Sequence, residues 1–241
     1  MEMQLMCPSH SNTSAPPMRD RSQPARADVL RHERLHVVDD ALSRIVLGGV
    51  RDGRTDSQQF AALTGHLATR LIWQACADLP LRTTSVPGFS GNPINVDEAD
   101  ERIAGVLILR AGLLFAPAFR ALLPTAPLRQ IGLRRDEDVL EARQYTSNLP
   151  TTAGWTDHVL LLEPMLATGG SARTAIRLLR EHHAGRITLL SLIGAPLGVA
   201  TVLEADPQVR IIVCALDDAL NAQGYIVPGL GDAGDRLFGT D

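Results

Sequence analysis

The sequence predicts an α/β fold, a doubly wound and mostly parallel sheet with helices on both faces. Short continuous aliphatic runs alternate with helical stretches, which is typical of strands buried between two helix layers. The chain has 241 residues, of which 45% are hydrophobic, enough for one well-cored domain. Residues 1–28 have no apolar period and include Pro16, Pro17 and Pro24, so we expect a disordered N-terminal extension before a single domain at residues 29–241.

The expected elements follow in order along the chain. From Ser57 to Leu79 apolar residues recur at three- and four-residue steps, which predicts an amphipathic helix closed by Pro80. Residues 87–100 are rich in Gly, Pro, Asn and acids and predict a loop or hairpin. The remaining expected elements are strands at 103–109, 158–162, 187–193 and 209–215 and helices at 114–123, 171–183 and 199–205. Such sheets bind ligands beyond the carboxyl ends of their strands.

Composition excludes several kinds of chemistry. All 23 basic residues are Arg and none is Lys, so a P-loop lysine, a pyridoxal Schiff base and a lysine nucleophile are excluded. Arg pairs bidentately with phosphate, which favours an enzyme of phosphorylated substrates. The net charge of −4 argues against a nucleic-acid partner. No apolar run of about 20 residues is present, so we expect no membrane partner and a cytoplasmic protein. The three cysteines are far apart and are interpreted as free thiols.

One segment combines a strand end, an acid and a glycine turn. The expected strand at 158–162 is followed by Glu163, and the sequence Thr168-Gly169-Gly170-Ser171 leads directly into an expected helix. Free backbone N–H groups at a helix start bind anions, and glycine lets a phosphate approach the main chain. Glu163 is placed to accept hydrogen bonds from sugar hydroxyls. Because Gly-rich turns are common between strands and helices, this segment alone leaves a purely structural role open.

Arginines follow two further apolar segments. Arg110 ends the strand expected at 103–109, and Arg134 and Arg135 follow the segment Ile131-Gly132-Leu133. An Arg at the carboxyl end of a strand faces the ligand side, where a pyrophosphate would bind it. At this point a surface salt bridge explains Arg110 equally well, and a solvated charge run explains the other pair.

The C-terminal stretch 224–240 contains five glycines with acids and apolar residues between them. This pattern predicts a loop that presents its backbone to a ligand, and a planar base is a suitable one. Tyr225 lies beside this loop, where its ring would pack either against a base or ribose or into the core. Asp217 and Asp218 follow the last expected strand and are interpreted as loop acids.

Four segments together resemble the uracil phosphoribosyltransferase family. They read LILRAGL, IGLRRD, EPMLATGGS and GYIVPGLGDAGDRLFGT, and the similarity covers nearly everything from about residue 31 to residue 241. The resemblance implies a type I phosphoribosyltransferase fold and a pentosyltransferase that uses phosphoribosyl pyrophosphate (PRPP) and uracil to make UMP and pyrophosphate. It also implies Mg²⁺ carried by PRPP with no protein metal site, a homo-oligomer (dimer or tetramer), and an effector role for GTP in some members.

The resemblance also assigns roles by position. Arg110 and Arg135 would contact the pyrophosphate, and Arg135 and Asp232 would be catalytic. The ribose and 5′-phosphate would be held by Glu163, Pro164, Met165, Leu166, Ala167, Thr168, Gly169, Gly170 and Ser171. The base would be held by Ile226, Gly231, Asp232 and Ala233, with Asp232 also near PRPP, and Tyr225 is added because its ring lies beside this loop.

The sequence departs from the family pattern at four positions. Glu163 stands where the family usually has Asp, Arg134 where Tyr is common, Asn148 where Lys is common, and Gln74 replaces a Glu. One added methylene moves a carboxylate by about an ångström, and misplacement on that scale costs on the order of 10²-fold in rate. Because the departures gather on the donor side, a divergent paralogue stays open as an alternative.

Three alternatives to uracil transfer therefore remain. The chain could use another pyrimidine or heterocycle as acceptor, although the intact GYIVPGLGDAGDR segment argues against this. It could be a nucleotide-sensing regulator of the same fold, which the retained carboxylate at Glu163 and the net charge of −4 do not favour. It could also be an inactive partner in a hetero-oligomer.

Overall fold

The computed structural model describes residues 24–135 and 142–240, apart from the side chains of Arg135 and Ala142. In this part of the chain the central sheet has the order β1-β10-β9-β7-β4-β5-β6, with β8 beside β9. Every pair in it is parallel except β5 with β6. The strands are β1 (Leu35–Val37), β4 (Ile103–Leu109), β5 (Leu128–Arg135), β6 (Ala142–Ser147), β7 (His158–Leu162), β8 (Met165–Leu166), β9 (Arg186–Gly194) and β10 (Arg210–Leu216).

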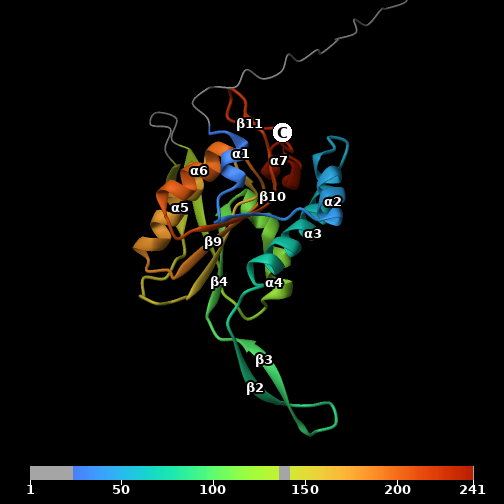
Figure 1. Ribbon diagram of the computed structural model, residues 1–241, viewed down its shortest axis with the longest axis vertical. Helices are drawn as coiled ribbons and strands as arrows, with labels where there is room; N and C mark the ends of the chain where they lie inside the picture. Colours follow the sequence, from blue (N-terminus) through green and yellow to red (C-terminus); the bar gives the residue numbers. More distant parts are fainter. Residues whose placement is uncertain (1–23, 136–141, 241) are drawn as a thin grey trace, which may run out of the picture.

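Two helix layers enclose the sheet, which confirms the predicted doubly wound fold. In β7 every residue is buried, and its side chains alternate between two cores: Leu160 and Leu162 pack with Phe60 of α3, and Val159 and Leu161 pack with Leu179 of α5. Figure 1 shows α2, α3 and α4 on one side of the sheet and α1, α5 and α6 on the other. The helices are α1 (Arg26–Leu30), α2 (Ala41–Arg51), α3 (Ser57–Ala75), the 3-10 helix η1 (Ala111–Phe115), α4 (Ala116–Leu122), α5 (Gly170–Glu181), α6 (Pro196–Ala205) and α7 (Ala233–Phe238).

Two antiparallel hairpins stand outside the sheet. Strands β2 (Leu81–Pro87) and β3 (Pro93–Ala99) form a long hairpin that projects away from the body of the molecule (Figure 1). The hairpin alternative expected for residues 87–100 is confirmed for the turn and β3, whereas β2 lies almost entirely before that segment and was not predicted. Strands β11 (Ala219–Leu220) and β12 (Ile226–Val227) form a short hairpin at the opposite end.

Three predicted boundaries are corrected, and one of them is the start of α6, which begins at Pro196 rather than at residue 199. The N-terminal extension does not reach residue 28, because α1 begins at Arg26, whose Nε donates to the carbonyl of Leu216 at 2.8 Å, and Val29 joins the core. The predicted disorder of the preceding segment concerns residues 1–23, which lie outside the described part, and stays a prediction. Helix α3 ends at Ala75 rather than Leu79, because its cap residue, Cys76, leaves helical geometry before Pro80 is reached.

The sequence patterns did not predict β1, β5, β6 or α2. Strand β5 mixes polar with apolar residues because it lies near the edge of the sheet, where β6 is the only described strand beyond it. Helix α2 contains Gly48 and Gly49, which obscure the helical period. A Cβ on Gly49 would lie 2.9 Å from Leu63 Cδ1, so glycine allows α2 to pack closely on α3.

Candidate active site

The carboxyl ends of the parallel strands meet at one edge of the sheet, opposite the β2–β3 hairpin (Figure 1). Residues 110–112 leave β4 there, residues 163–171 leave β7, and α7 lies over the same edge. Strand β5 runs parallel to β4, with Gly132 opposite Leu109, so Arg134 and Arg135 follow at this edge too. The fold therefore brings the four predicted clusters to one edge of the sheet.

The turn after β4 packs against the end of β7. A Cβ on Gly112 would lie 2.7 Å from the carbonyl oxygen of Leu162, so only glycine fits here without a shift. Arg110, which follows a cis peptide bond, begins this turn. Its Nη2 lies 3.3 Å from Oδ1 of Asp235 in α7, and both side chains are partly exposed. The surface salt bridge that was left open as an alternative role of Arg110 thus exists, and it reaches the C-terminal segment.

Two glycines allow the turn between β8 and α5 to pack closely against α6. Gly169 has φ +80° and caps α5, and a Cβ there would lie 2.7 Å from the carbonyl oxygen of Gly198. A Cβ on Gly198 would lie 2.5 Å from the carbonyl oxygen of Ala167, so α6 supports the turn at close range. No described side chain caps α5 closely, since Thr168 Oγ1 is 3.5 Å from the N–H of Gly170. The first N–H groups of α5 are therefore available to an anion.

Glu163 carries the most perturbed carboxyl group at this edge. Its backbone N–H donates to Leu190 at 3.1 Å, which fixes the residue at the end of β7. Its Oε2 is shielded from solvent and has no hydrogen-bond partner in the described part of the chain. Burial raises the pKa of Glu163 to about 8, so the free protein keeps this carboxyl largely protonated at neutral pH. A ligand with hydroxyl groups would supply the missing hydrogen bonds.

Three of the residues predicted to hold PRPP belong to the frame of this segment. Met165 and Leu166 form β8, which pairs with β9, and the Leu166 side chain is fully buried. The carbonyl of Leu166 accepts from Ala195 at 2.9 Å, and that of Pro164 accepts from Leu192 at 2.9 Å. Pro164 and Leu166 therefore direct these groups inward and support the turn that follows.

The C-terminal stretch is more ordered than the predicted loop, because β12 and α7 lie within it. Asp232 is the N-cap of α7, and its Oδ1 accepts from the N–H groups of Gly234 at 2.8 Å and Asp235 at 3.0 Å. The Asp232 residue is otherwise exposed at the edge of the sheet. The carboxylate thus has a structural role in addition to any contact with a ligand.

The residues predicted to hold the base differ in how they can meet one. Ile226 and Ala233 are almost entirely buried in the core, and their contact with a base stays a prediction. Gly231 has φ +80°, a conformation that favours glycine. Tyr225 is 53% exposed, and its N–H donates to Asn221 Oδ1 at 2.9 Å. The aromatic ring is therefore a surface feature and no core anchor.

Sequence reasoning missed the contacts of three residues that hold this segment. Asp217 lies in the loop after β10, as predicted, but it is buried and pairs with Arg51 at the end of α2. Its position directly after buried β10 was a usable signal, whereas nothing in the local pattern marks Arg51. Arg236 donates to the carbonyls of Leu230 at 2.8 Å and Asp52 at 2.9 Å, and its guanidinium lies 4.3 Å from the centroid of the Phe60 ring.

The four departures from the family pattern have different surroundings. Asn148 Oδ1 accepts from the N–H of Gln130 at 2.8 Å, and Gln74 Oε1 accepts from Arg70 at 3.1 Å. Both therefore have local partners. Arg134 is exposed near the end of β5. The side chain of its neighbour Arg135, a predicted catalytic residue, lies outside the described part.

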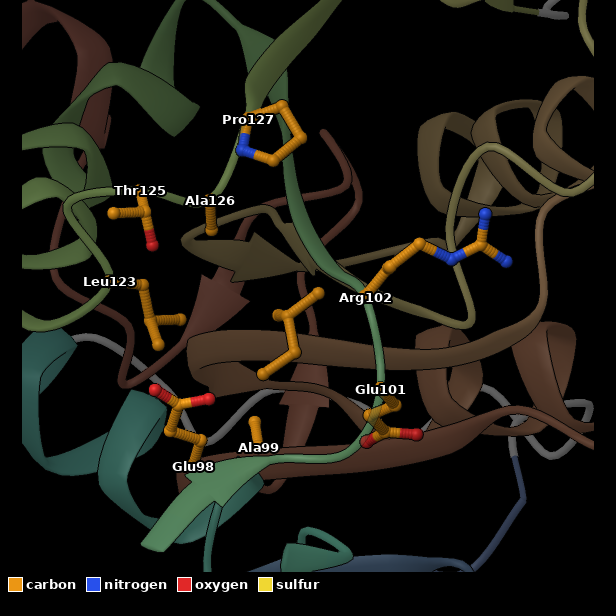
Figure 2. Close-up of a pocket in the computed structure, with 9 residues that line it drawn as sticks. Glu98, Ala99, Glu101, Arg102, Leu123, Thr125, Ala126 and Pro127 are labelled. Atoms are coloured by element: carbon orange, nitrogen blue, oxygen red, sulfur yellow. The ribbon is translucent and has the colours of Figure 1, made fainter. Parts of the chain in front are cut away.

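Two hollows differ in their relation to this edge. One of about 300 Å³ is lined in part by Thr55, Asp232 and Asp235, next to the predicted site. A larger one of about 550 Å³ lies at the amino ends of β4 and β5, at the opposite edge of the sheet. Figure 2 shows that Leu123 and Glu98 border it, while the Arg102 side chain points away from them. The larger hollow is therefore separate from the predicted site residues.

Comparisons with known proteins agree with one another. A family model described as uracil phosphoribosyltransferase matches residues 37–240. The uracil phosphoribosyltransferase of Caldanaerobacter subterraneus subsp. tengcongensis is 41% identical over 213 residues, covering 87% of this chain and 99% of that protein. The one from Roseiflexus castenholzii is 46% identical over 191 residues, covering 79% of this chain and 91% of that protein. The solved structure of the AQ2163 protein from Aquifex aeolicus matches with a TM-score of 0.79 and 33% identity, covering 85% of this chain and 97% of that one.

No group of three or more His, Cys, Asp and Glu residues in residues 24–135 and 142–240 is arranged to hold a metal ion. Within the same residues, no helix is both long and apolar enough to cross a membrane.

Proposed function

The chain belongs to the uracil phosphoribosyltransferase family, and we propose that the carboxyl edge of its sheet is the active site. It is an enzyme that transfers the 5-phosphoribosyl group of PRPP to N1 of uracil and yields UMP and pyrophosphate. One observation supports the site assignment most strongly. A buried Glu163 oxygen without a partner among the described residues lies on the same segment as the uncapped start of α5.

The donor half of the site comprises residues 163–171, Arg110 and Arg135. The 5′-phosphate is assigned to the free N–H groups at the start of α5, and the ribose hydroxyls to Glu163. Arg110 is assigned to the pyrophosphate. Its present partner is Asp235, and the pair is exposed. Such pairs contribute only about 0–1 kcal/mol to stability, so pyrophosphate can replace Asp235 at a small cost in free energy. Arg135 is assigned to the same group on the family resemblance.

The base half comprises Tyr225, Ile226, Gly231, Asp232 and Ala233. The edge of uracil is assigned to backbone N–H and C=O groups of this loop, in which Gly231 and Asp232 are exposed. The positive φ of Gly231 supports this reading, since a glycine leaves the backbone open to a flat ligand. The exposed ring of Tyr225 would cover one side of the base or ribose.

The reaction needs charge stabilisation more than a nucleophile. Breaking the bond between C1′ and the pyrophosphate oxygen builds positive charge on the ribose and negative charge on the leaving group. The guanidinium groups of Arg110 and Arg135 would stabilise the departing pyrophosphate. The carboxylate of Asp232 would stabilise the cationic ribose, and no covalent step on the protein is required.

Mg²⁺ is proposed to enter with PRPP. Such ions usually bind one or two carboxylates together with substrate phosphates, not a cage of protein ligands. The exposed carboxylate of Asp232 fits that donor set. When bound, the ion would neutralise phosphate charge on the donor.

A homo-oligomer, either a dimer or a tetramer, is also proposed. The hairpin of β2 and β3 exposes Leu81 (61%), Ile94 (50%) and the entire side chain of Phe89. A two-stranded hairpin is marginally stable alone, and both of its faces expose an apolar side chain, since Leu81 and Ile94 lie on opposite faces. A second copy of the chain would cover them.

Cys76 and Cys214 are free thiols, as is usual in a reducing compartment, which supports the cytoplasm as the location. Regulation by GTP, which the family resemblance allows, stays a prediction.

A structure with bound UMP tests the site assignment. The phosphate is expected at the first N–H groups of α5, the ribose hydroxyls at Glu163, and uracil against residues 226–233. A nucleotide bound elsewhere, such as in the hollow of Figure 2, would contradict the assignment.

A further inference from the structure

A buried ion pair joins α2 to the residue that follows β10. Arg51 Nη1 donates to Asp217 Oδ2 at 2.9 Å, and Nη2 donates to Oδ1 at 2.5 Å. The two side chains are 23% and 4% exposed. This two-point contact fixes the relative orientation of both groups. Buried ion pairs add little net stability, because desolvation offsets the attraction, so stability alone does not explain this pair.

The same pair holds both polar groups of one backbone residue. The N–H of Gly229 donates to Asp217 Oδ2 at 2.9 Å, and its C=O accepts from Arg51 Nη1 at 2.7 Å. Gly229 has φ +70°, and a Cβ there would lie 2.2 Å from the carbonyl oxygen of Ile226. The direction of the chain at Gly229 is therefore set by the ion pair and by the absence of a side chain.

Gly229 lies between the two parts of the proposed base site, Ile226 on one side and residues 231–233 on the other. The next residue, Leu230, is also tied to the end of α2, because Arg236 bridges the carbonyls of Leu230 and Val50. The end of α2, more than 170 residues away in sequence, thus anchors this loop.

We propose that the Arg51–Asp217 pair positions the base-binding loop and acts through Gly229, without touching substrate. This proposal rests on the proposed assignment of uracil to residues 226–233. Recognition by backbone groups depends on the path of the chain, and misplacement by about 1 Å costs on the order of 10²-fold in rate. Loss of the pair should therefore impair the use of uracil far more than the use of PRPP.

Steady-state kinetics of the full chain with PRPP, uracil and Mg²⁺ test this. In Arg51→Gln and Asp217→Asn we expect the KM for uracil to rise at least about tenfold, with the KM for PRPP within about threefold. The KM for uracil of the double variant should be no higher than that of the more impaired single variant, because the two residues act as a unit. Arg51→Lys should recover part of the loss, because an ammonium keeps the charge but lacks the planar fork.

Matched controls separate positioning from general damage. Asp218→Asn changes the exposed neighbour of Asp217, and Arg44→Gln breaks an exposed pair between Arg44 of α2 and Asp39, which precedes the helix. Both should stay within about twofold of the wild type in every constant. A single variant that leaves a buried charge unpaired can fail to fold, so the double variant, which removes both charges, is compared by thermal melting.

The outcomes are distinct. A folded double variant with an unchanged KM for uracil, or with equal losses for both substrates, overturns the positioning role. Asp232→Ser tests the assignment of the active site to this edge separately. If it loses turnover while the pair variants do not, only the positioning role is wrong; if it too is unaffected, the site assignment fails and the positioning role with it.

Discussion

The carboxylate of Asp235 lies 3.3 Å from the guanidinium of Arg110, so one ion pair links the turn after β4 to the last helix of the chain. The first of these residues is assigned to the pyrophosphate, and the second stands three residues beyond Asp232 in the base half. Both side chains are partly exposed, so the pair can open without a large cost. This contact makes Arg110 a defined target for mutation.

Replacement of Arg110 by Ala should weaken PRPP use selectively. A charge-assisted contact to phosphate is lost, so we expect the KM for PRPP to rise about 10- to 100-fold. The KM for uracil should change by less than about threefold. Asp235→Asn is the matched variant, and it should leave PRPP use nearly intact because pyrophosphate replaces Asp235 as the partner. Equal losses for both substrates in Arg110→Ala would contradict the assignment.

Replacement of Gly169 by Ala should damage both stability and donor binding. The new Cβ would meet the Gly198 carbonyl at 2.7 Å in a backbone conformation with φ +80°, so we expect a loss of about 1–3 kcal/mol in the free energy of unfolding. Gly170→Ala is the control, because the closest atom to its Cβ is Thr168 Oγ1 at 3.7 Å. Urea denaturation compares the two, and equal stability losses would show that the geometry of Gly169 is not critical.

Asp232 has two roles that different substitutions separate. Ser retains an N-cap for α7 but removes the carboxylate, so Asp232→Ser should keep the melting temperature and lose most turnover. Asp232→Ala should lose turnover and also about 0.5–2 kcal/mol of stability. Melting curves and UMP formation are measured on the same samples. Wild-type turnover in Asp232→Ser would exclude a catalytic role for the carboxylate.

Glu163 should make stability depend on pH. Its pKa is raised from 4.5 to about 8, so between these values the folded protein holds a proton that the unfolded chain has released. The contribution of Glu163 to the free energy of unfolding should therefore be complete below pH 4.5, fall as pH rises, and level off above about pH 8. Urea denaturation across this range measures it.

The Glu163→Gln variant should lack this dependence. As pH rises, its free energy of unfolding should therefore increase relative to that of the wild type, by on the order of a few kcal/mol. Glu204→Gln, at an exposed position, is the control and should follow the wild type. If the Glu163→Gln profile ran parallel to that of the wild type, the raised pKa would be wrong.

The buried strands and their ligand edge could be predicted because each strand is a continuous aliphatic run. The expected bounds of β4 and β7 match the observed ones, and Glu163 and Arg110 stand at strand ends, where the pattern points directly to the ligand side. Short β1 and mixed β5 have no such run. They are strands because of their neighbours in the sheet, which periodicity does not report.

The residues that position the site were harder to predict than the residues assigned to bind substrate. Arg51 and Asp217 are 166 positions apart, and no local pattern relates them. The N-cap role of Asp232 was hidden because glycines in the sequence 229–234 suggested a loop, while α7 begins at Ala233. Leu166 and Pro164 were assigned to PRPP by position, and only the backbone pairing of β8 identifies them as part of the frame.

UMP formation by the purified protein tests the function most directly. The protein is incubated with Mg²⁺, PRPP and uracil beside matched reactions with cytosine, thymine and other pyrimidines. Rapid turnover selective for uracil is the expected result, and it would identify Glu163 as a tolerated departure from the usual Asp. No turnover with any pyrimidine, while PRPP or UMP still binds, would contradict uracil transfer and indicate another acceptor or a nucleotide sensor.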